Sequence, residues 1–242
     1  MSFRIIILAG GKGARMNCED LPKVLVQVNA QPMIEYAVAI SEALGVKPIV
    51  VTGFKKELID DYLGERVDYV FQEEQLGTGH AVLMVKDLLK EFSGQVLVMY
   101  GDHPLIKRET LEKLIENHKD PITIMTTTVE DYDDWRDCLR GFGKIIKKDQ
   151  LITAIREVKD CNDQELEIKE LNPGYYCFDS QWLWANIDKL KNENSQSEYY
   201  LTDLIDLAVS QGYSINSVEI EPVECLGVNT LEQLKKVEEL TN

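Results

Sequence analysis

Hydrophobic runs alternate with amphipathic stretches along the first half of the chain. The apolar runs, rich in β-branched residues, cover 3–9, 48–52, 67–71, 95–100 and 122–129. The stretches with helical periodicity cover 32–44, 55–63, 77–92 and 108–117. Strands and helices that alternate at this spacing predict a largely parallel sheet with helices on both faces. We therefore expect a Rossmann-like, doubly wound α/β unit.

The pattern changes after residue 130. Three short apolar runs, 141–149, 151–158 and 172–179, follow one another with only turns or polar segments between them, and helical patterns resume near Gln181 and Leu201. This order predicts a small antiparallel lobe built onto the same mixed, mainly parallel sheet. Because no low-complexity linker or internal repeat interrupts the chain, we expect one domain over 1–242, with halves of approximately 1–130 and 131–242.

Composition excludes several classes of protein. The 242 residues carry 26 Lys and Arg against 42 Asp and Glu, a formal charge of −16, which argues against binding to nucleic acid or to an anionic membrane surface. The five cysteines are scattered and form no CxxC pair, so neither a disulfide framework nor a zinc site is indicated. No apolar stretch approaches the roughly 20 residues of a membrane span, and the N-terminal run is too short for a signal peptide. We expect a cytoplasmic protein.

The first apolar run leads into a glycine-rich loop, IIILAGGKGARM, at residues 5–16. Such a loop brings backbone N–H groups against phosphate, because glycine permits close approach and positive φ. A Walker A loop needs Lys-Ser/Thr after its last glycine, but Ala14 and Arg15 follow Gly13. A dinucleotide fingerprint needs a glycine where Met16 stands and an acidic residue at the end of the second strand. A merely tight turn after a core strand remains an alternative.

Two cations follow the loop. Arg15 lies within it, and Lys23 comes directly after Pro22, which fixes the local backbone. Both side chains can lie near whatever the loop holds, although such a pair of charges is also typical of a solvated surface.

The motifs of this loop resemble those of a known family. LAGGKGARM followed by LPKVL resembles the signature of the sugar nucleotidyltransferases. Further matching motifs follow in order along nearly the whole chain: QEEQLGTGHA, YGDHPL, GFGKI, REVKD, ELNPGYYCFD, SEYYLTD and GVNTLEQL. This set is similar to the N-terminal domain of the bacterial N-acetylglucosamine-1-phosphate uridylyltransferases.

The chain departs from the family pattern at four positions. Gly10 and Ala14 replace the usual alanine and threonine of the loop, Pro173 replaces the threonine of the usual N-T-G, and His103 occupies a normally apolar place. The bifunctional relatives continue into a left-handed β-helix with an acetyltransferase site and trimer contacts. The chain shows no hexapeptide repeats, so we carry over neither acetyl transfer nor the trimer, and we leave the oligomeric state open.

The resemblance implies a reaction between the small-molecule substrates UTP and N-acetylglucosamine 1-phosphate, which gives UDP-N-acetylglucosamine and pyrophosphate. The attacking phosphate is already ionised, so the chemistry requires positioning and charge neutralisation rather than a general base. Arg15 and Lys23 are the expected catalytic cations. The expected nucleotide-binding residues are Leu8, Ala9, Gly10, Gly11, Lys12, Gly13, Gln72, Gln75, Gly77 and Thr78.

The resemblance also implies a metal and a sugar site. Asp102 and Asn229 would supply two oxygen ligands to Mg²⁺, although an aspartate after a strand is by itself commonly a turn or helix cap. The expected sugar-binding residues are Tyr100, Gly101, Gly143, Glu157, Asn172, Tyr200 and Thr202. The half of the chain up to about residue 130 would thus bind nucleotide, and the second half would bind sugar and supply one metal ligand.

Two alternatives stay open on the sequence. The same chemistry could act on another sugar phosphate or nucleotide, such as glucose 1-phosphate or dTTP, because Gly10 and Pro173 depart from the pattern. A catalytically silent module that binds UDP-sugars is the second alternative, although such a module would not require both the phosphate cations and the metal ligands.

Overall fold

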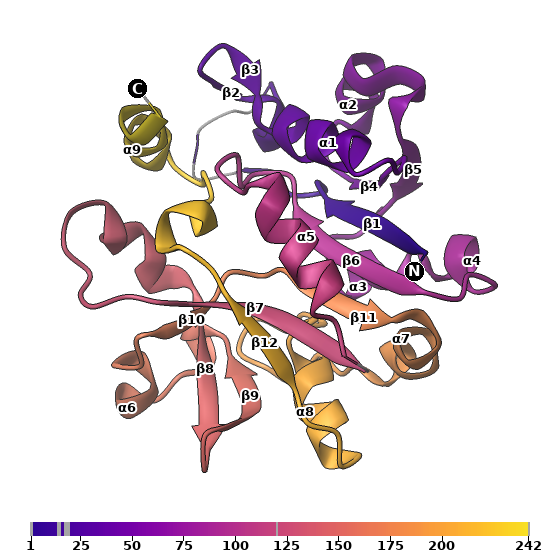
Figure 1. Ribbon diagram of the computed structural model, residues 1–242. Coiled ribbons are helices and arrows are strands. Elements are labelled where there is room, and N and C mark those ends of the chain that lie inside the picture. The colour runs from indigo at the N-terminus through magenta and orange to yellow at the C-terminus, as the bar shows by residue number, and fades with distance from the viewer. Residues whose placement is uncertain (1, 14–15, 17–19, 120, 242) are drawn as a thin grey trace.

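The computed structural model describes residues 2–13, 16, 20–119 and 121–241, and its centre is one large mixed sheet (Figure 1). Four parallel strands form one side of the sheet, in the order β5 (Asp68–Phe71), β4 (Ile49–Thr52), β1 (Phe3–Leu8) and β6 (Gln95–Tyr100). The sheet then continues through β11 (Tyr176–Asp179), β7 (Ile122–Thr128), β10 (Glu170–Asn172), β8 (Gly143–Lys148) and β9 (Leu151–Arg156).

One strand from the second half of the chain is inserted among strands of the first half. β11 lies antiparallel between β6 and β7, with Tyr176 opposite both Val98 and Ile124 (Figure 1). β12 (Asn216–Glu219) pairs with β7 in parallel, beside the main strand order. The antiparallel lobe is therefore hydrogen-bonded into the sheet of the first half of the chain rather than attached by a linker.

Helices cover both faces of the sheet because its central strands are apolar on both sides. In β1, Ile5 and Ile7 pack in one core cluster and Ile6 and Leu8 in the other, as the alternation of side chains along a strand requires. The first cluster includes residues of α1 (Met33–Ala43), α2 (Lys56–Leu63), α5 (Arg108–Glu116) and α9 (Leu231–Thr241). The second includes residues of α3 (Thr78–Leu83), α4 (Lys86–Leu89), α7 (Ser180–Asn186) and α8 (Asp203–Ser210).

Short elements complete the described chain. These are the hairpin β2 (Gln27–Val28) and β3 (Gln31–Pro32), helix α6 (Asp163–Leu166), and the 3₁₀ helices η2 (Lys23–Leu25), η3 (Gly64–Arg66), η4 (Asp134–Gly141), η5 (Val158–Asp160), η6 (Ile187–Lys189) and η7 (Pro222–Cys225).

The predicted α/β fold is confirmed, and the structure refines it in three places. The helix predicted over 77–92 is two helices, α3 and α4. The strand predicted over 172–179 is two strands, because the turn between β10 and β11 has Gly174 at φ 86°, a conformation that ends an extended run. β12 was not predicted, since its half-exposed NSVE sequence lacks an apolar run.

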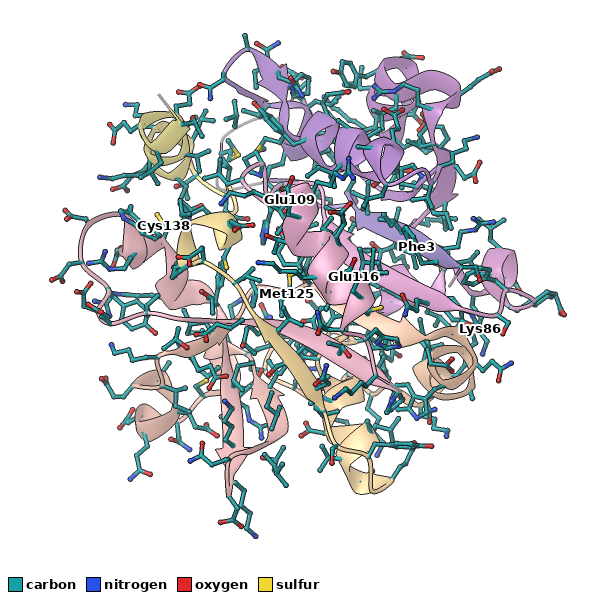
Figure 2. The ribbon with its side chains drawn as sticks, viewed as in Figure 1. Phe3, Lys86, Glu109, Glu116, Met125 and Cys138 are labelled. Atoms are coloured by element: carbon teal, nitrogen blue, oxygen red, sulfur yellow. The ribbon has the colours of Figure 1, made fainter. Side chains whose placement is uncertain are left out.

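The surface carries the charge that the composition requires. Figure 2 shows Lys86, Glu109 and Glu116 on the outer sides of their helices, whereas Met125 of β7 is fully buried. None of the helices in the described part of the chain is long and apolar enough to cross a membrane.

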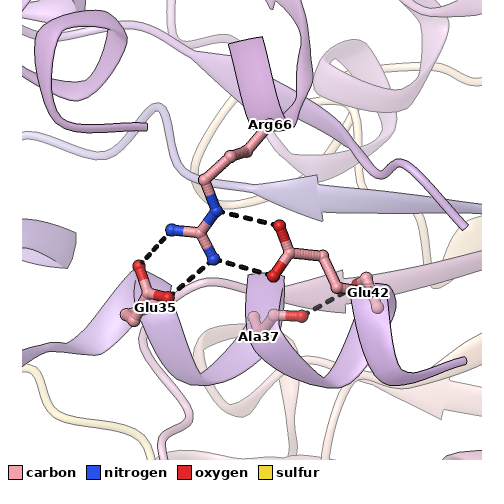
Figure 3. Close-up of polar contacts among 5 residues, drawn as sticks. Glu35, Ala37, Glu42 and Arg66 are labelled. Carbon is pink, nitrogen blue, oxygen red and sulfur yellow. Dashed lines mark hydrogen bonds and ion pairs between the residues drawn. The ribbon is translucent and has the colours of Figure 1, made fainter. Parts of the chain in front are cut away.

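A charged contact ties η3 to α1 (Figure 3). The Arg66 guanidinium donates two hydrogen bonds of 2.7 and 2.8 Å to Glu35, and two of 2.8 Å to Glu42. The hydrogen bonds from Arg66 lower the pKa of the Glu42 carboxyl. An arginine that makes two parallel hydrogen bonds to a carboxylate fixes the geometry of the contact more closely than a single surface ion pair does.

We expect Arg66→Ala to lower the free energy of unfolding by about 1 kcal/mol, at the upper end of partly exposed ion pairs. Urea denaturation of the wild type and the variant measures the difference. Arg108→Ala is the matched control, because among the described residues Arg108 pairs with one carboxylate, Glu112 of its own helix, at 2.8 Å. An equal effect of the two substitutions would show that the double clamp adds nothing.

Candidate active site

A pocket of about 350 Å³ opens at the carboxyl end of the parallel strands. This is the edge where open α/β sheets bind ligands. Eight of the residues predicted to bind nucleotide line it: Leu8, Ala9, Gly10, Gly11, Gln72, Gln75, Gly77 and Thr78. Lys12 and Gly13 are not among the lining residues, and Arg15 lies outside the described part of the chain.

Lys23, Asp102 and Asn229 meet in the same pocket. The Lys23 ammonium donates to Asp102 Oδ2 and, at 2.8 Å, to Asn229 Oδ1. The side chains of Lys23 and Asp102 are only 13% and 10% exposed, so this contact is largely shielded from water. Lys23, predicted as a phosphate-binding cation, therefore lies in direct contact with Asp102 and Asn229, the two predicted metal ligands.

The backbone brings these residues together from distant parts of the sequence. Val228 N–H donates to the Asp102 carbonyl at 3.0 Å, which places the neighbouring Asn229 beside Asp102. A Cβ on Gly227 would lie 2.6 Å from the His103 ring, so only glycine fits there. The GVN motif thus approaches the YGDH motif by backbone contact as well as through Lys23.

Charges in this cluster decide its protonation. Burial alone would raise the pKa of Asp102, but the Lys23 ammonium, His103 and a backbone hydrogen bond together hold that pKa below its usual value. Burial lowers the pKa of His103 against the opposing effect of Asp102. His103 Nδ1 lies 3.1 Å from the Tyr175 hydroxyl, and its Nε2 lies 3.8 Å from Asp102 Oδ1. At neutral pH we therefore assign Asp102 as a carboxylate and His103 as a neutral ring.

Close backbone approach shapes the glycine loop. A Cβ on Gly53 would lie 2.6 Å from the Gly10 carbonyl oxygen, so the ends of β1 and β4 meet without side chains between them. Gly13 has φ 63°, and a Cβ there would lie 2.7 Å from Lys23 Cβ. Glycine at these positions lets the loop pack against the segment that carries Lys23.

A second segment, at residues 198–201, packs against the pocket residues Gly77 and Thr78. Gly79 N–H donates to the Tyr199 carbonyl at 2.8 Å, and Tyr199 N–H donates to the Leu76 carbonyl at 2.7 Å. Leu201 N–H donates to the Thr78 hydroxyl at 3.0 Å. Gly77 has φ 110°, and a Cβ there would lie 2.6 Å from the Tyr199 oxygen. The GTG and EYYL motifs are therefore one interlocked unit.

Gln72 is buried at the end of β5 and has both ends of its amide in defined places. Its Nε2 donates to the Gly77 carbonyl at 3.2 Å and lies 3.0 Å from His80 Nδ1. A Cβ on Gly10 would lie 3.1 Å from Gln72 Oε1, so the oxygen lies beside the glycine loop. Gln75 Nε2 donates to the backbone carbonyl of Gln72 at 3.2 Å.

The residues predicted to bind sugar gather around Tyr100, which lines the pocket. Gly174 lies against the Tyr100 ring, and Asn172 Oδ1 accepts from Gly174 N–H at 3.1 Å. Asn172 Nδ2 donates to the Tyr176 hydroxyl at 2.7 Å. Gly143 pairs with Asn172 across β8 and β10, and Gly101 follows Tyr100 with its N–H on the Leu8 carbonyl at 3.0 Å.

The remaining predicted sugar residues lie beside a group of carboxylates. The Thr202 hydroxyl donates to Glu157 Oε1 at 3.3 Å, and the Tyr200 hydroxyl accepts from Gln196 at 2.6 Å. Burial raises the pKa of Glu157, which the Thr202 hydrogen bond partly opposes. Burial and the charge of Asp206 raise the pKa of Asp203 to about 6.

Four lining residues were not predicted: Val24, Ala81, His103 and Glu198. All four lie within motifs that point to the site, namely PKVL, QLGTGHA, YGDHPL and SEYYLTD. Their inward orientation follows from long-range contacts such as that of Tyr199 with Leu76, which no local pattern reveals. Within the described residues, no three His, Cys, Asp or Glu side chains form a group that could hold a metal.

A glycine loop at the end of the first strand, with a lysine, an aspartate and an asparagine converging beside it, defines a nucleotidyltransferase-type α/β domain. The chain matches the MobA-like NTP transferase domain over residues 5–239 and belongs to that family.

Curated relatives align with almost the whole chain. The bifunctional protein GlmU of Clostridium beijerinckii is 40% identical over 240 residues, which are 97% of this chain and 51% of the relative. GlmU of Streptococcus agalactiae is 42% identical over 235 residues, 95% of this chain and 50% of the relative. The chain spans about half the length of these relatives, and the family it belongs to is one of nucleotidyltransferase domains.

Two solved structures share the fold. A putative glucose-1-phosphate thymidylyltransferase from Bacillus anthracis, in complex with sucrose, aligns with a TM-score of 0.75 and 22% identity over 99% of this chain and 95% of its own. A UDP-glucose pyrophosphorylase complexed with UDP-glucose aligns with a TM-score of 0.77 and 17% identity over 100% of this chain and 98% of its own.

The raised pKa of Asp203 predicts a pH-dependent stability. The folded chain binds this proton more tightly than the unfolded chain, whose Asp203 has the ordinary pKa of about 3.9, so unfolding free energy falls as pH rises from about 4 through about 6. We expect Asp203→Asn to raise the melting temperature more at pH 8 than at pH 4.5. Asp61→Asn, at an exposed position of α2, is the control. A gain that is the same at both pH values would contradict the assignment.

Proposed function

We propose that the chain transfers a uridylyl group from UTP to N-acetylglucosamine 1-phosphate and releases pyrophosphate. The observation that carries the proposal is the shared position of Lys23, Asp102 and Asn229 in the pocket that the glycine loop lines. The 37–42% identity with the N-terminal half of GlmU proteins supports the choice of this reaction within the family.

The proposed chemistry needs no general base. An ionised oxygen of the sugar phosphate attacks the α-phosphorus of UTP, a new P–O bond forms, and the bond to the bridging oxygen breaks as pyrophosphate leaves. The Lys23 ammonium would stabilise charge on the transferring and leaving phosphates. Arg15, which lies outside the described residues, is proposed for the same task from its place in the motif.

The oxygens of Asp102 and Asn229 fit a hard divalent cation, because they already converge on one positive charge, the Lys23 ammonium. We propose that they hold Mg²⁺, which when bound neutralises negative charge on the phosphates. Asp102 is ready for this role because its lowered pKa keeps it ionised at neutral pH.

The remaining pocket residues divide between the two substrates. We propose that the glycine loop, including Lys12 and Gly13, cradles the triphosphate through backbone N–H groups, and that Gln72, Gln75, Gly77 and Thr78 receive the base. The residues around Tyr100 and Glu157 would receive the sugar. A carboxylate accepts hydrogen bonds from sugar hydroxyl groups, and an amide can both donate to them and accept from them.

Glucose 1-phosphate is the second candidate acceptor. Pro173 is buried between Asn172 and Gly174, next in sequence to a residue proposed to bind the sugar, and it replaces the threonine usual in the resembling family. A proline has no N–H and no hydroxyl there, so the acetamido group would meet a different wall.

Pyrophosphate release from a panel of substrates tests the proposal. UTP, dTTP, CTP and ATP are combined with N-acetylglucosamine 1-phosphate, glucose 1-phosphate and N-acetylgalactosamine 1-phosphate, with Mg²⁺ and with a chelator. We expect the highest kcat/KM for UTP with N-acetylglucosamine 1-phosphate, and loss of turnover on chelation that added Mg²⁺ reverses. A higher kcat/KM for glucose 1-phosphate would replace the proposed acceptor, and an inactive panel would refute the transferase.

Asp102→Asn tests the cation cluster, because it keeps the shape of the side chain and removes its charge. We expect kcat/KM to fall by about 10²–10³-fold, the usual effect of losing one preorganised charged group. Asp68→Asn is the control, since Asp68 pairs with Lys47 at 2.8 Å on the exposed edge strand. Thermal unfolding of both variants checks that they fold. A wild-type rate in folded Asp102→Asn would remove Asp102 from the metal site.

A further inference from the structure

The amide of Gln72 is fixed in one orientation by two acceptors. The carbonyl oxygen of Gly77 lies 3.2 Å from one end of the amide and can only accept a hydrogen bond, so that end must be the nitrogen. The same nitrogen lies 3.0 Å from His80 Nδ1. An amide nitrogen can only donate hydrogen bonds, so His80 Nδ1 must accept this one. That requires the histidine tautomer that carries its proton on Nε2.

This arrangement leaves the amide oxygen for the pocket. Gln72 lines the pocket, and Oε1 lies on the side of Gly10. Within the described part of the chain, no donor lies within hydrogen-bonding distance of Oε1. The residue as a whole is only 4% exposed, and it lines the pocket, so a partner for Oε1 would approach from the pocket. The pocket therefore presents an acceptor that a ligand N–H can satisfy.

The neighbouring backbone supplies groups of the opposite kind. Gly11 and Gly77 line the same pocket, and their N–H groups have no acceptor among the residues that the structure describes. A pocket that offers one such acceptor together with backbone donors has the groups that an imide edge requires, in which an N–H lies between two carbonyl groups. Uracil and thymine have this edge, whereas cytosine has an acceptor nitrogen in place of the N–H.

We propose that His80 is the positioning residue for base selectivity: it holds the Gln72 amide with its oxygen toward the base, so that the site accepts imide pyrimidines and rejects cytosine. The inference rests on the proposed function, in which this pocket receives the nucleotide. His80 does not touch the base in this proposal. It acts together with the Gly77 carbonyl, as the second and closer acceptor of the amide nitrogen, and so disfavours the alternative orientation of the amide, in which the nitrogen would face the pocket and pair with cytosine.

The geometry also explains the chain's departure at position 10. A Cβ there would lie 3.1 Å from Gln72 Oε1, tighter than ordinary van der Waals contact, so a side chain would press on the oxygen that reads the base. Gly10 leaves that oxygen accessible from the loop side. Within the described residues, the amide is thus held by Gly77 and His80 at its nitrogen and accepts no hydrogen bond at its oxygen.

Two variants separate this role from simple packing. His80→Leu keeps an apolar side chain beside Tyr199 but removes the acceptor, and His80→Asn keeps an acceptor, Oδ1, at the position of Nδ1. For each folded variant, kcat/KM is measured with UTP, CTP and dTTP. Equilibrium binding of UTP and CTP is measured by calorimetry without sugar phosphate.

We expect His80→Leu to lower the preference for UTP over CTP at least tenfold in both measurements, since an amide released from one acceptor can turn. His80→Asn should retain most of the wild-type preference. The ratio of UTP to dTTP should stay constant in every variant, because uracil and thymine share the imide edge.

Each contrary result has a distinct meaning. An unchanged preference in His80→Leu, or equal loss in both variants, would refute the positioning role and reduce His80 to a packing residue. A wild type that binds UTP over CTP but transfers to another sugar phosphate would refute the proposed acceptor and leave the role of His80 standing. A wild type without preference for UTP over CTP in binding would refute the inference, whatever its turnover.

Discussion

The Lys23 ammonium, shared between Asp102 and Asn229, is the interaction on which the site depends. It joins residues that are 79 and 206 positions from Lys23 in the sequence, and in a chain of net charge −16 it concentrates positive charge where phosphates are proposed to bind. A buried lysine with no partner would be unstable as a cation, and a buried aspartate with none would take up a proton. The ammonium favours the charged form of the Asp102 carboxyl, and Asn229 accepts a further hydrogen bond from the ammonium without adding charge.

This interaction requires backbones to approach one another more closely than side chains allow. Gly53 meets Gly10, Gly227 meets His103, and Gly77 meets Tyr199, each at a distance that a Cβ would forbid. These contacts join loops from the ends of separate strands into one wall. Glycine therefore acts here by being small and, at Gly77, by adopting a positive φ, and the polar residues of the pocket derive their positions from it.

The sequence predicted the parallel half of the sheet well, because its strands are buried on both faces and read as continuous apolar runs. It predicted the ends of β10 and β11 poorly, because a buried glycine turn within NPGYYCFD looks apolar throughout. For the site, motif order placed the glycine loop, Gln72, Lys23, Asp102 and Asn229 in one pocket. It did not show Glu198 in the lining or His80 on the Gln72 amide, since both depend on the contact of residues 76–80 with residues 198–201. The roles of these residues remain proposals.

The two parts of the proposed site differ in how they are built, and this bears on specificity. The residues proposed to receive the base, such as Gln72 and Gly77, and the cluster of Lys23, Asp102 and Asn229 lie near the ends of parallel strands. Backbone hydrogen bonds and glycine contacts fix the positions of these residues from several sides. The residues proposed to bind the sugar come from the antiparallel lobe, where Gly143, Asn172 and Glu157 are linked to Tyr100 through side chains and one turn. A substitution in that turn, such as Pro173, can alter the sugar wall without moving Lys23 or Gln72. The fold thus allows the acceptor to change while the chemistry and the choice of nucleotide stay the same.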